Sequence, residues 1–272
     1  MKIAALIQAH HAPDLLARLV DALAGDLWQP YLHLDAKANA DAFADTIARV
    51  RLVDRRVDVR WSEFTQVEAT LASLRTALAD AANTHFYLMS GQCFPLRSDD
   101  VIRRTIEALP ADAQNLIAVR PMPEPSKPLS RLDWHSRLRR PWRLRALIDA
   151  VAARLGPPPA SRRLIGMGVL HAGSNWWLLD RATVTAMLGW LAANPWYLRA
   201  MKRAKFADEM FFQTLLMLTG RRAGGPQPTI AKWIEGRANP EIVDAAVLTE
   251  MLAGSALFGR KFTAMSPTPD LA

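Results

Sequence analysis

KIAALIQAH (residues 2–10), APDLLARLVDALA (residues 12–24) and PYLHLDAK (residues 30–37) decide the fold. The first and third segments are short apolar runs, which predict buried strands. The second begins with Pro-Asp and repeats apolar residues at spacings of three and four, which predicts a helix. Strand, helix and strand in this order form a unit whose strands run parallel, with the helix on one face. The sequence therefore predicts an α/β fold with a mainly parallel central sheet flanked by helices.

The same alternation continues to about residue 120. Ligands of such sheets bind beyond the carboxyl ends of the strands. Three strand ends are therefore candidates for a binding site: His10-His11, Asp35-Ala36-Lys37 and Trp61-Ser62-Glu63. The further strands expected here are residues 55–61, 84–90 and 115–120, and the further helices are residues 40–50, 67–83 and 99–110.

Prolines and arginines punctuate residues 121–163, which we interpret as a long insert with one helix over residues 143–156. Beyond it, the pattern predicts a turn and a strand within residues 169–180, and then three helices. These helices are residues 182–194, 207–220 and 241–254. We expect one domain over residues 1–272, made of residues 1–120, the basic insert and residues 164–272.

Composition narrows the class of protein. Half of the 272 residues are apolar, so a sizeable core is available, and the single cysteine, Cys93, excludes an internal disulfide framework. The first residues are too short an apolar run for a signal peptide, and no later run is long enough to span a bilayer. These features predict a cytoplasmic protein.

The net charge of +8 favours anionic partners such as phosphates, nucleotide sugars or acidic lipid headgroups. Arginines are concentrated in residues 131–163. This segment is a candidate for peripheral contact with the inner face of the membrane, although a solvated surface without a partner explains it as well.

Several common nucleotide and metal motifs are missing. No glycine-rich phosphate loop follows the first strand, no P-loop motif occurs, and the six histidines form no HExxH motif. Many nucleotide-sugar enzymes hold a divalent metal on two aspartates one residue apart, but no two acidic residues of this chain have that spacing. The usual acidic metal clamp is therefore absent, and we expect no metal and no cofactor.

Five blocks in order carry a resemblance: HLDAK (33–37), YLMSGQCFPLRS (87–98), AGSNWWLLD (172–180), ADEMFFQTLL (207–216) and LFGRKF (257–262). Together they resemble the core-2/I-branching enzyme family of glycosyltransferases, which includes branching N-acetylglucosaminyltransferases and peptide O-xylosyltransferases. The resemblance implies a nucleotide-binding fold related to the GT-A class, a UDP-sugar donor, a saccharide or glycoconjugate acceptor, inversion at the anomeric carbon and no metal. It also implies that residues 1–120 bind the nucleotide and that residues 164–272 hold the acceptor and the catalytic base.

The catalytic residue that the resemblance implies is Glu209, because the family places a glutamate in a P-D-E block as the base. Ala207 stands where the family usually has proline. A sugar hydroxyl is a poor nucleophile until its proton is leaving, so an inverting enzyme needs such a base. An acidic residue in a first helical turn is also explained by the helix dipole, so this reading stays open. We assign Asp208 to a capping or supporting role.

On the donor side, the resemblance places Lys261 at the diphosphate, with Arg260 beside it. Cationic side chains can offset charge that develops on a departing diphosphate. A solvated basic pair near the C-terminus is the alternative. The family has a further arginine upstream, where this chain has Glu241, and Arg237 is the candidate substitute.

Asp35 matches an aspartate that binds uracil in the family, and a helix cap is the alternative. Trp61 lies near the family's aromatic residue for the donor base, and core packing is the alternative. On the acceptor side, Trp233 matches an aromatic residue near the bound sugars. Ser174 is also a candidate for sugar binding.

In the same block as Ser174, we expect Gly173 where another part of the backbone approaches closely. We also expect one of Trp176 and Trp177 to lie in the core, because neighbouring side chains of a strand point to opposite faces. Cys93 replaces an aspartate of the family, and we interpret it as a small buried residue.

Two alternatives to catalysis remain from the sequence. One is a basic α/β protein that binds nucleic acid or an anionic membrane through residues 131–163. The other is a family member that binds UDP without turnover, which Cys93 and Glu241 suggest. The favoured hypothesis remains transfer of N-acetylglucosamine or xylose from a UDP-sugar, with no nucleic-acid partner.

Overall fold

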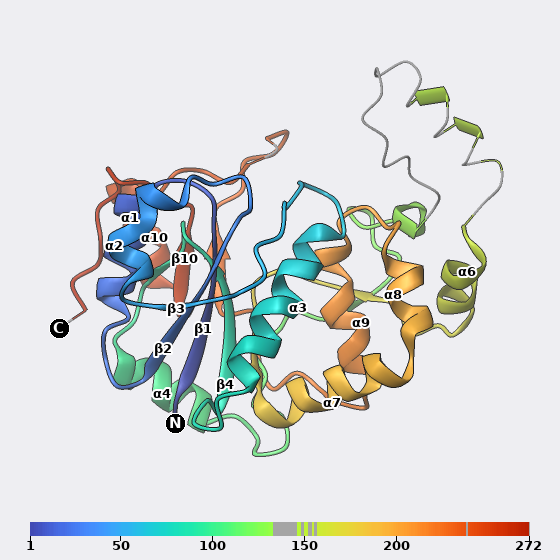
Figure 1. Cartoon of the computed structure of the whole chain (residues 1–272), viewed down its shortest axis with the longest axis horizontal. Helices are drawn as coiled ribbons and strands as arrows, with labels where there is room; N and C mark the ends of the chain where they lie inside the picture. Colours follow the sequence, from blue (N-terminus) through green and yellow to red (C-terminus); the bar gives the residue numbers. More distant parts are fainter. Residues whose placement is uncertain (133–145, 148–149, 152–153, 155–156, 238, 272) are drawn as a thin grey trace.

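A five-stranded sheet forms the centre of the protein in a computed structural model that describes residues 1–132, 146–147, 150–151, 154, 157–237 and 239–271 (Figure 1). Its strand order is β3-β2-β1-β4-β8, and only β8 runs antiparallel to its neighbour. The expected α/β class with a mainly parallel sheet is therefore confirmed. The strands are β1 (Ile3–Ala9), β2 (Trp28–Leu34), β3 (Arg51–Leu52), β4 (His85–Ser90) and β8 (Leu178–Asp180).

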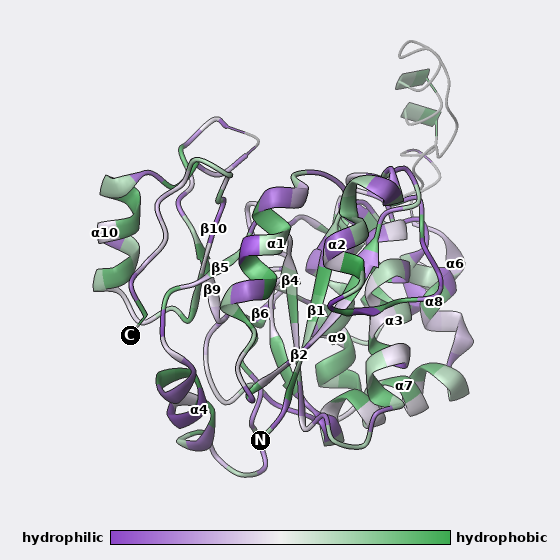
Figure 2. Ribbon diagram, turned by 60° about the vertical axis from the view of Figure 1, so that its left-hand side comes forward, coloured by the Kyte–Doolittle hydropathy of each residue, from purple (hydrophilic) through white to green (hydrophobic). Residues whose placement is uncertain are grey.

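Alternate side chains of β1 enter two separate cores, one on each face of the sheet. Ile3, Ala5 and Ile7 pack in the first core, whereas Ala4 and Leu6 pack in the second, and all five are fully buried. This is the pattern of a central strand covered on both faces. Figure 2 shows the consequence, with hydrophobic central strands and more hydrophilic outer segments.

The first core lies under helices that come mainly from the N-terminal half, with one helix from the C-terminal end. The amphipathic spacing of each helix supplies the apolar face, as in α1, whose Leu15, Leu16 and Leu19 are buried. The elements on this side are α1 (Pro13–Ala22), η1 (Ala40–Phe43), α2 (Ala44–Ile47), α4 (Asp99–Glu107) and α10 (Ala245–Ala253).

The second core holds the larger aromatic side chains. Trp177 is fully buried and packs against Phe212, with ring centroids 4.9 Å apart. Trp176 is only partly buried, so the expectation that one tryptophan of the pair belongs to the core is confirmed. The helices on this side are α3 (Thr65–Leu78), α6 (Pro159–Gly166), α7 (Arg181–Ala193), α8 (Pro195–Met201) and α9 (Phe211–Leu218).

Two smaller sheets complete the fold. The first has the order β5-β10-β9 and is joined to the central sheet by the hydroxyls of Tyr87 and Thr229, which lie 2.8 Å apart. The second pairs β6 with β7. Their strands are β5 (Phe94–Pro95), β9 (Thr229–Ala231), β10 (Phe258–Arg260), β6 (Arg120–Pro121) and β7 (His171–Ala172).

Two predicted strands are wrong. Residues 55–60 form no strand, because the backbone amides of Val57 and Val59 donate to the side chains of His33 and Asp35 instead of to a neighbouring strand. Residues 115–120 form only a bridge, in which Leu116 pairs with both Leu178 and Gly225, before the short β6. At Val57 and Val59, side chains from another part of the chain thus take the amide hydrogen bonds that a strand would use.

The basic insert is described only in part. It begins with β6 and a 3₁₀ helix, η2 (Leu129–Leu132), and ends in α6. Most of the expected helix over residues 143–156, and most of the proposed membrane-contact segment 131–163, lies outside the described residues. No helix in the described part of the chain combines the length and apolar character that crossing a membrane requires.

The Tyr87–Thr229 contact predicts a measurable coupling between the two sheets. Both residues are buried, and each substitution leaves the hydroxyl of the other residue without its hydrogen-bond partner. Tyr87→Phe and Thr229→Val should therefore each lower the free energy of unfolding by about 1 kcal/mol. The double variant should lose less than the sum of the single losses. Urea unfolding of all four proteins measures this, and strictly additive losses would show that the contact does not join the sheets.

Candidate active site

The predicted site residues lie mainly in loops and short turns, some of which follow strands of the central sheet. His10 and His11 follow β1, and Asp35 follows β2. Trp61 lies in the loop between β3 and α3, and Lys261 follows β10. Glu209 belongs to a short 3₁₀ helix, η3 (Ala207–Glu209), that precedes α9. The structure thus collects residues from distant parts of the sequence at one edge of the sheet.

Glu209 is not in the first turn of an α-helix, as the sequence had suggested. Met210 has φ −131° and ψ −28°, which separates η3 from α9, and the carbonyl of Glu209 accepts a hydrogen bond from Gly173 N at 2.9 Å. Phe206 begins the turn in the left-handed region, with φ 51°. The helix-dipole explanation for this carboxylate therefore does not apply in its original form.

Two cations from the insert hold one oxygen of Glu209. Arg131 Nη1 donates to Glu209 Oε2 at 2.8 Å, and Lys127 Nζ lies 3.6 Å from the same oxygen. Within the described residues, no contact engages Oε1. The side chain of Glu209 is 32% exposed, so part of this side chain is open to solvent.

Sequence reasoning missed both cations. Lys127 and Arg131 lie in the proline- and arginine-rich stretch, 82 and 78 residues before Glu209 in the sequence, and no spacing pattern marks them. Lys127 is buried, and its Nζ donates to Gly173 O at 2.6 Å. Burial lowers the pKa of Lys127, while Glu209 and Glu124 act in the opposite direction. Only the folded structure shows that this lysine is buried beside two carboxylates, and that arrangement marks it as a candidate site residue.

An aromatic contact chain leads from this cluster to Trp61. The Arg131 guanidinium lies over the Phe206 ring, 4.9 Å from its centroid, and Phe206 meets Trp61 edge to face at 5.0 Å. Phe206 N also donates to Ser62 O at 3.0 Å. Trp61 is 78% exposed, so it is not a core residue, and its expected role toward the donor base stays a prediction.

Asp35 is buried, and its carboxylate is already fully hydrogen-bonded. Oδ1 accepts from Lys37 N and Nζ, and Oδ2 accepts from Lys37 Nζ and from Val59 N. A carboxylate offers about four acceptor positions, so these contacts use them all. In this conformation Asp35 fixes the loop after β3, and its contact with a uracil ring stays a prediction.

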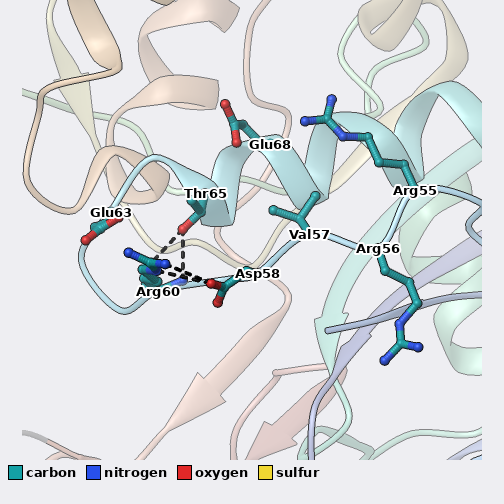
Figure 3. Close-up of a pocket in the computed structure, with 8 residues that line it drawn as sticks. All are labelled: Arg55, Arg56, Val57, Asp58, Arg60, Glu63, Thr65 and Glu68. Atoms are coloured by element: carbon teal, nitrogen blue, oxygen red, sulfur yellow. Dashed lines mark hydrogen bonds and ion pairs between the residues drawn. The ribbon is translucent and has the colours of Figure 1, made fainter. Parts of the chain in front are cut away.

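An open pocket of about 330 Å³ lies beside this loop (Figure 3). Lys37 connects it to Asp35, because Lys37 Nζ also contacts Asp58 Oδ1 at 2.7 Å. Asp58, Arg60 and Thr65 point toward one another, as Figure 3 shows. Three arginines and three carboxylates line the pocket together with Val57 and Thr65. The lining residues are Arg55, Arg56, Val57, Asp58, Arg60, Glu63, Thr65 and Glu68.

Arg260 and Lys261 form the cationic end of the site. The Arg260 guanidinium lies over the ring of Trp176, with its carbon 4.8 Å from the ring centroid. Burial lowers the pKa of His11, and the charges of His10 and of Lys261 act in the same direction, which places Lys261 near His11. The arginine–lysine pair is therefore folded against the strand ends, and the alternative of a free solvated pair does not describe Arg260.

The remaining candidates occupy the rim. Trp233 is 61% exposed in the loop after β9, and that loop returns to Lys261 through Val243 N, which donates to Lys261 O at 3.0 Å. Glu241 lies 3.9 Å from Lys232, which gives it a structural partner. Arg237 lies exposed in the same loop.

Ser174 faces its own backbone, because its hydroxyl accepts from Trp176 N at 3.3 Å. Cys93 is buried, as expected, and its sulfur accepts from Ser90 N. Among the described residues, no three side chains of histidine, cysteine, aspartate or glutamate gather as a metal-binding group.

These features define an α/β protein whose strand ends gather a carboxylate between two cations and, separately, an arginine–lysine pair. The sequence model of the Core-2/I-Branching enzyme family matches residues 9–253. The chain belongs to this family and is thereby a glycosyltransferase, which confirms the family resemblance. The match includes the first four sequence blocks, and the fifth block (257–262) lies beyond it.

Other comparisons add little. No curated protein matches the sequence. A solved structure described as the crystal structure of 4-diphosphocytidyl-2C-methyl-D-erythritol synthase is similar at a TM-score of 0.41 and 11% identity, over 93% of this chain and 99% of that chain.

Gly173 sets the position of the turn that carries Glu209, which predicts a sharp effect of a single methyl group at this position. A Cβ at this position would lie 1.9 Å from the carbonyl oxygen of Ala118. Gly173→Ala should therefore lower the free energy of unfolding by about 2 kcal/mol, as overpacking does, and should displace Glu209. Gly189→Ala is the matched control, because nothing lies within 4 Å of that Cβ in α7. Thermal unfolding of both variants tests this, and equal stabilities would contradict it.

Asp208 predicts a pH dependence of stability. Burial, with the adjacent Glu209 carboxylate, raises the pKa of Asp208 to about 7. The carboxyl of Asp208 therefore keeps its proton to a higher pH in the folded state than in the unfolded state. The resulting stabilisation of the fold is present in full below pH 4 and is lost as the pH rises through 7. Asp208→Asn should remove this pH-dependent loss of stability. It should therefore raise the free energy of unfolding at pH 8, by at most about 4 kcal/mol. Urea unfolding at pH 5 and pH 8 measures it, and parallel pH profiles of the two proteins would refute it.

Proposed function

We propose that this protein is an inverting glycosyltransferase that moves a sugar, N-acetylglucosamine or xylose, from a UDP-sugar to a hydroxyl of a saccharide or glycoconjugate, without a metal ion. The observation that carries the proposal is the geometry of Glu209. One oxygen is held by Arg131 at 2.8 Å, and the side chain is 32% exposed.

Glu209 acts as the base in this proposal. Its Oε1 accepts the proton of the acceptor hydroxyl while the hydroxyl oxygen forms a bond to the anomeric carbon from the face opposite the leaving group. The bond between the anomeric carbon and the diphosphate oxygen breaks with its electron pair, so UDP leaves and the configuration inverts. Arg131 and Lys127 keep the carboxylate in place.

Arg260 and Lys261 act on the leaving group. The departing diphosphate gains negative charge in the transition state, and cationic donors that are already in position stabilise that charge without reorganisation. Trp61, Asp35, Trp233 and Ser174 are proposed to complete the donor and acceptor sites at the same edge of the sheet.

Peripheral contact of residues 131–163 with an anionic membrane surface belongs to the proposal as the route to a glycoconjugate acceptor. The two features that had suggested a family member without turnover each have a structural partner here. Cys93 is packed against Ser90, and Glu241 faces Lys232.

The proposal predicts a separation of binding from turnover. Glu209→Gln should lower transfer from a UDP-sugar at least about 100-fold, because general-base catalysis contributes 10² to 10⁴ in rate, while calorimetry should give an unchanged UDP affinity. Glu107→Gln, on exposed α4 at the opposite edge of the sheet, is the matched control and should keep full activity.

Transfer should be assayed over a panel of UDP-sugars, and calorimetry with UDP should be run with and without manganese. Full activity of Glu209→Gln would show that Glu209 is not the base. A wild-type protein that binds no UDP under either condition would overturn the donor class, whereas binding that requires manganese would overturn metal independence alone.

A further inference from the structure

One short segment contacts both ends of the candidate site. Gly173 N donates to Glu209 O at 2.9 Å, and Gly173 O accepts from Lys127 at 2.6 Å. Three residues later, the Trp176 ring lies against the Arg260 guanidinium, 4.8 Å from ring centroid to guanidinium carbon. Residues 173–176 therefore link the base to the cations proposed for the leaving group.

Arg260 has an unusual environment for an arginine. Its Nε is buried without a hydrogen-bond partner in the described part of the chain, and Arg260 makes no ion pair with the described carboxylates. A buried guanidinium N–H without an acceptor is costly unless a ligand supplies one. The ring of Trp176 is thus the contact that determines where this guanidinium lies.

Stacking on an aromatic face suits an arginine that must bind phosphate. The five N–H donors of a guanidinium lie in its plane, so contact through the face leaves the donor edges free for bidentate contact with phosphate oxygens. An ion pair to a carboxylate would instead occupy those donors. The tryptophan therefore restrains the cation without competing with an anionic ligand.

The backbone on both sides holds Trp176 in place. The backbone N–H of Trp176 donates to Ser174 Oγ at 3.3 Å, and the backbone carbonyl of Ser174 accepts from Gln213 Nε2 at 2.7 Å. The following residue, Trp177, is fully buried and packs on Phe212. The indole of Trp176 is consequently a fixed platform between the core and the site.

We propose that Trp176 is a positioning residue that holds the Arg260 guanidinium ready for the diphosphate of the donor. This inference rests on the proposed function, because it requires a nucleoside diphosphate at Arg260. Ser174, for which the sequence suggested sugar binding, serves in the same arrangement by fixing the backbone of Trp176.

The test compares Trp176→Leu, which removes the aromatic face, with Trp176→Phe, which keeps one. Trp176→Leu should weaken UDP binding about tenfold and raise KM for the UDP-sugar with a smaller effect on kcat. Trp176→Phe should stay within about threefold of the wild type. The affinity for uridine, measured by competition with UDP, should change in neither variant, because uridine has no phosphate for Arg260.

Two controls separate positioning from packing. Trp196→Leu removes another tryptophan that lies under an arginine, Arg163 at 4.1 Å, and should leave UDP affinity unchanged. In an Arg260→Ala background, Trp176→Leu should cause no further loss of UDP affinity, because the group that it positions is absent.

The inference is overturned if Trp176→Leu binds UDP as tightly as the wild type, if uridine affinity falls by the same factor, or if the loss persists without Arg260. A wild-type protein that fails to bind UDP overturns the proposed function and this inference together. Wild-type UDP binding with no response to Trp176→Leu overturns only the role of Trp176.

Discussion

The burial of β1 on both faces, with hydrogen-bonded strands on both edges, is the constraint on which the site depends. Because β2 and β4 run parallel to β1 in fixed register, the loops after these strands emerge at one edge of the sheet. Side chains that contact a ligand can then come from distant parts of the sequence. The rigid sheet fixes the position of the loops, and the loops can differ in chemistry without disturbing either core.

The turn that carries Glu209, η3, is attached to this framework by backbone contacts rather than by its own helix. Gly173 approaches Ala118 so closely that a side chain would not fit, and its amide holds the carbonyl of Glu209. The same glycine accepts a hydrogen bond from Lys127, which adds a charged contact beside Glu209. A single backbone position thus determines both the place of the carboxylate and the place of one of its cations.

The sequence predicted much of the fold, because periodicity reports which side chains are buried. It located β1, α1, α3 and β4 within a few residues. It failed for residues 55–61, whose alternating pattern is typical of a strand, because His33 and Asp35 take the amide hydrogen bonds. The order of the motifs pointed to Glu209, Arg260 and Lys261, whose roles stay predictions, whereas Lys127 and Arg131 lie in an irregular segment where no local pattern connects them to Glu209. Tertiary contacts alone make that connection.

The two adjacent carboxylates of η3 differ in their surroundings, and this difference supports their different roles. Arg131 and Lys127 contact Glu209, whereas burial dominates at Asp208 and raises its pKa to about 7. Near neutral pH, Asp208 therefore carries a proton for part of the time, which reduces repulsion between the neighbours. Two adjacent acids whose environments differ in this way can serve different roles. Glu209, with its cationic partners and a partly exposed side chain, is the member of the pair that we propose to accept a proton.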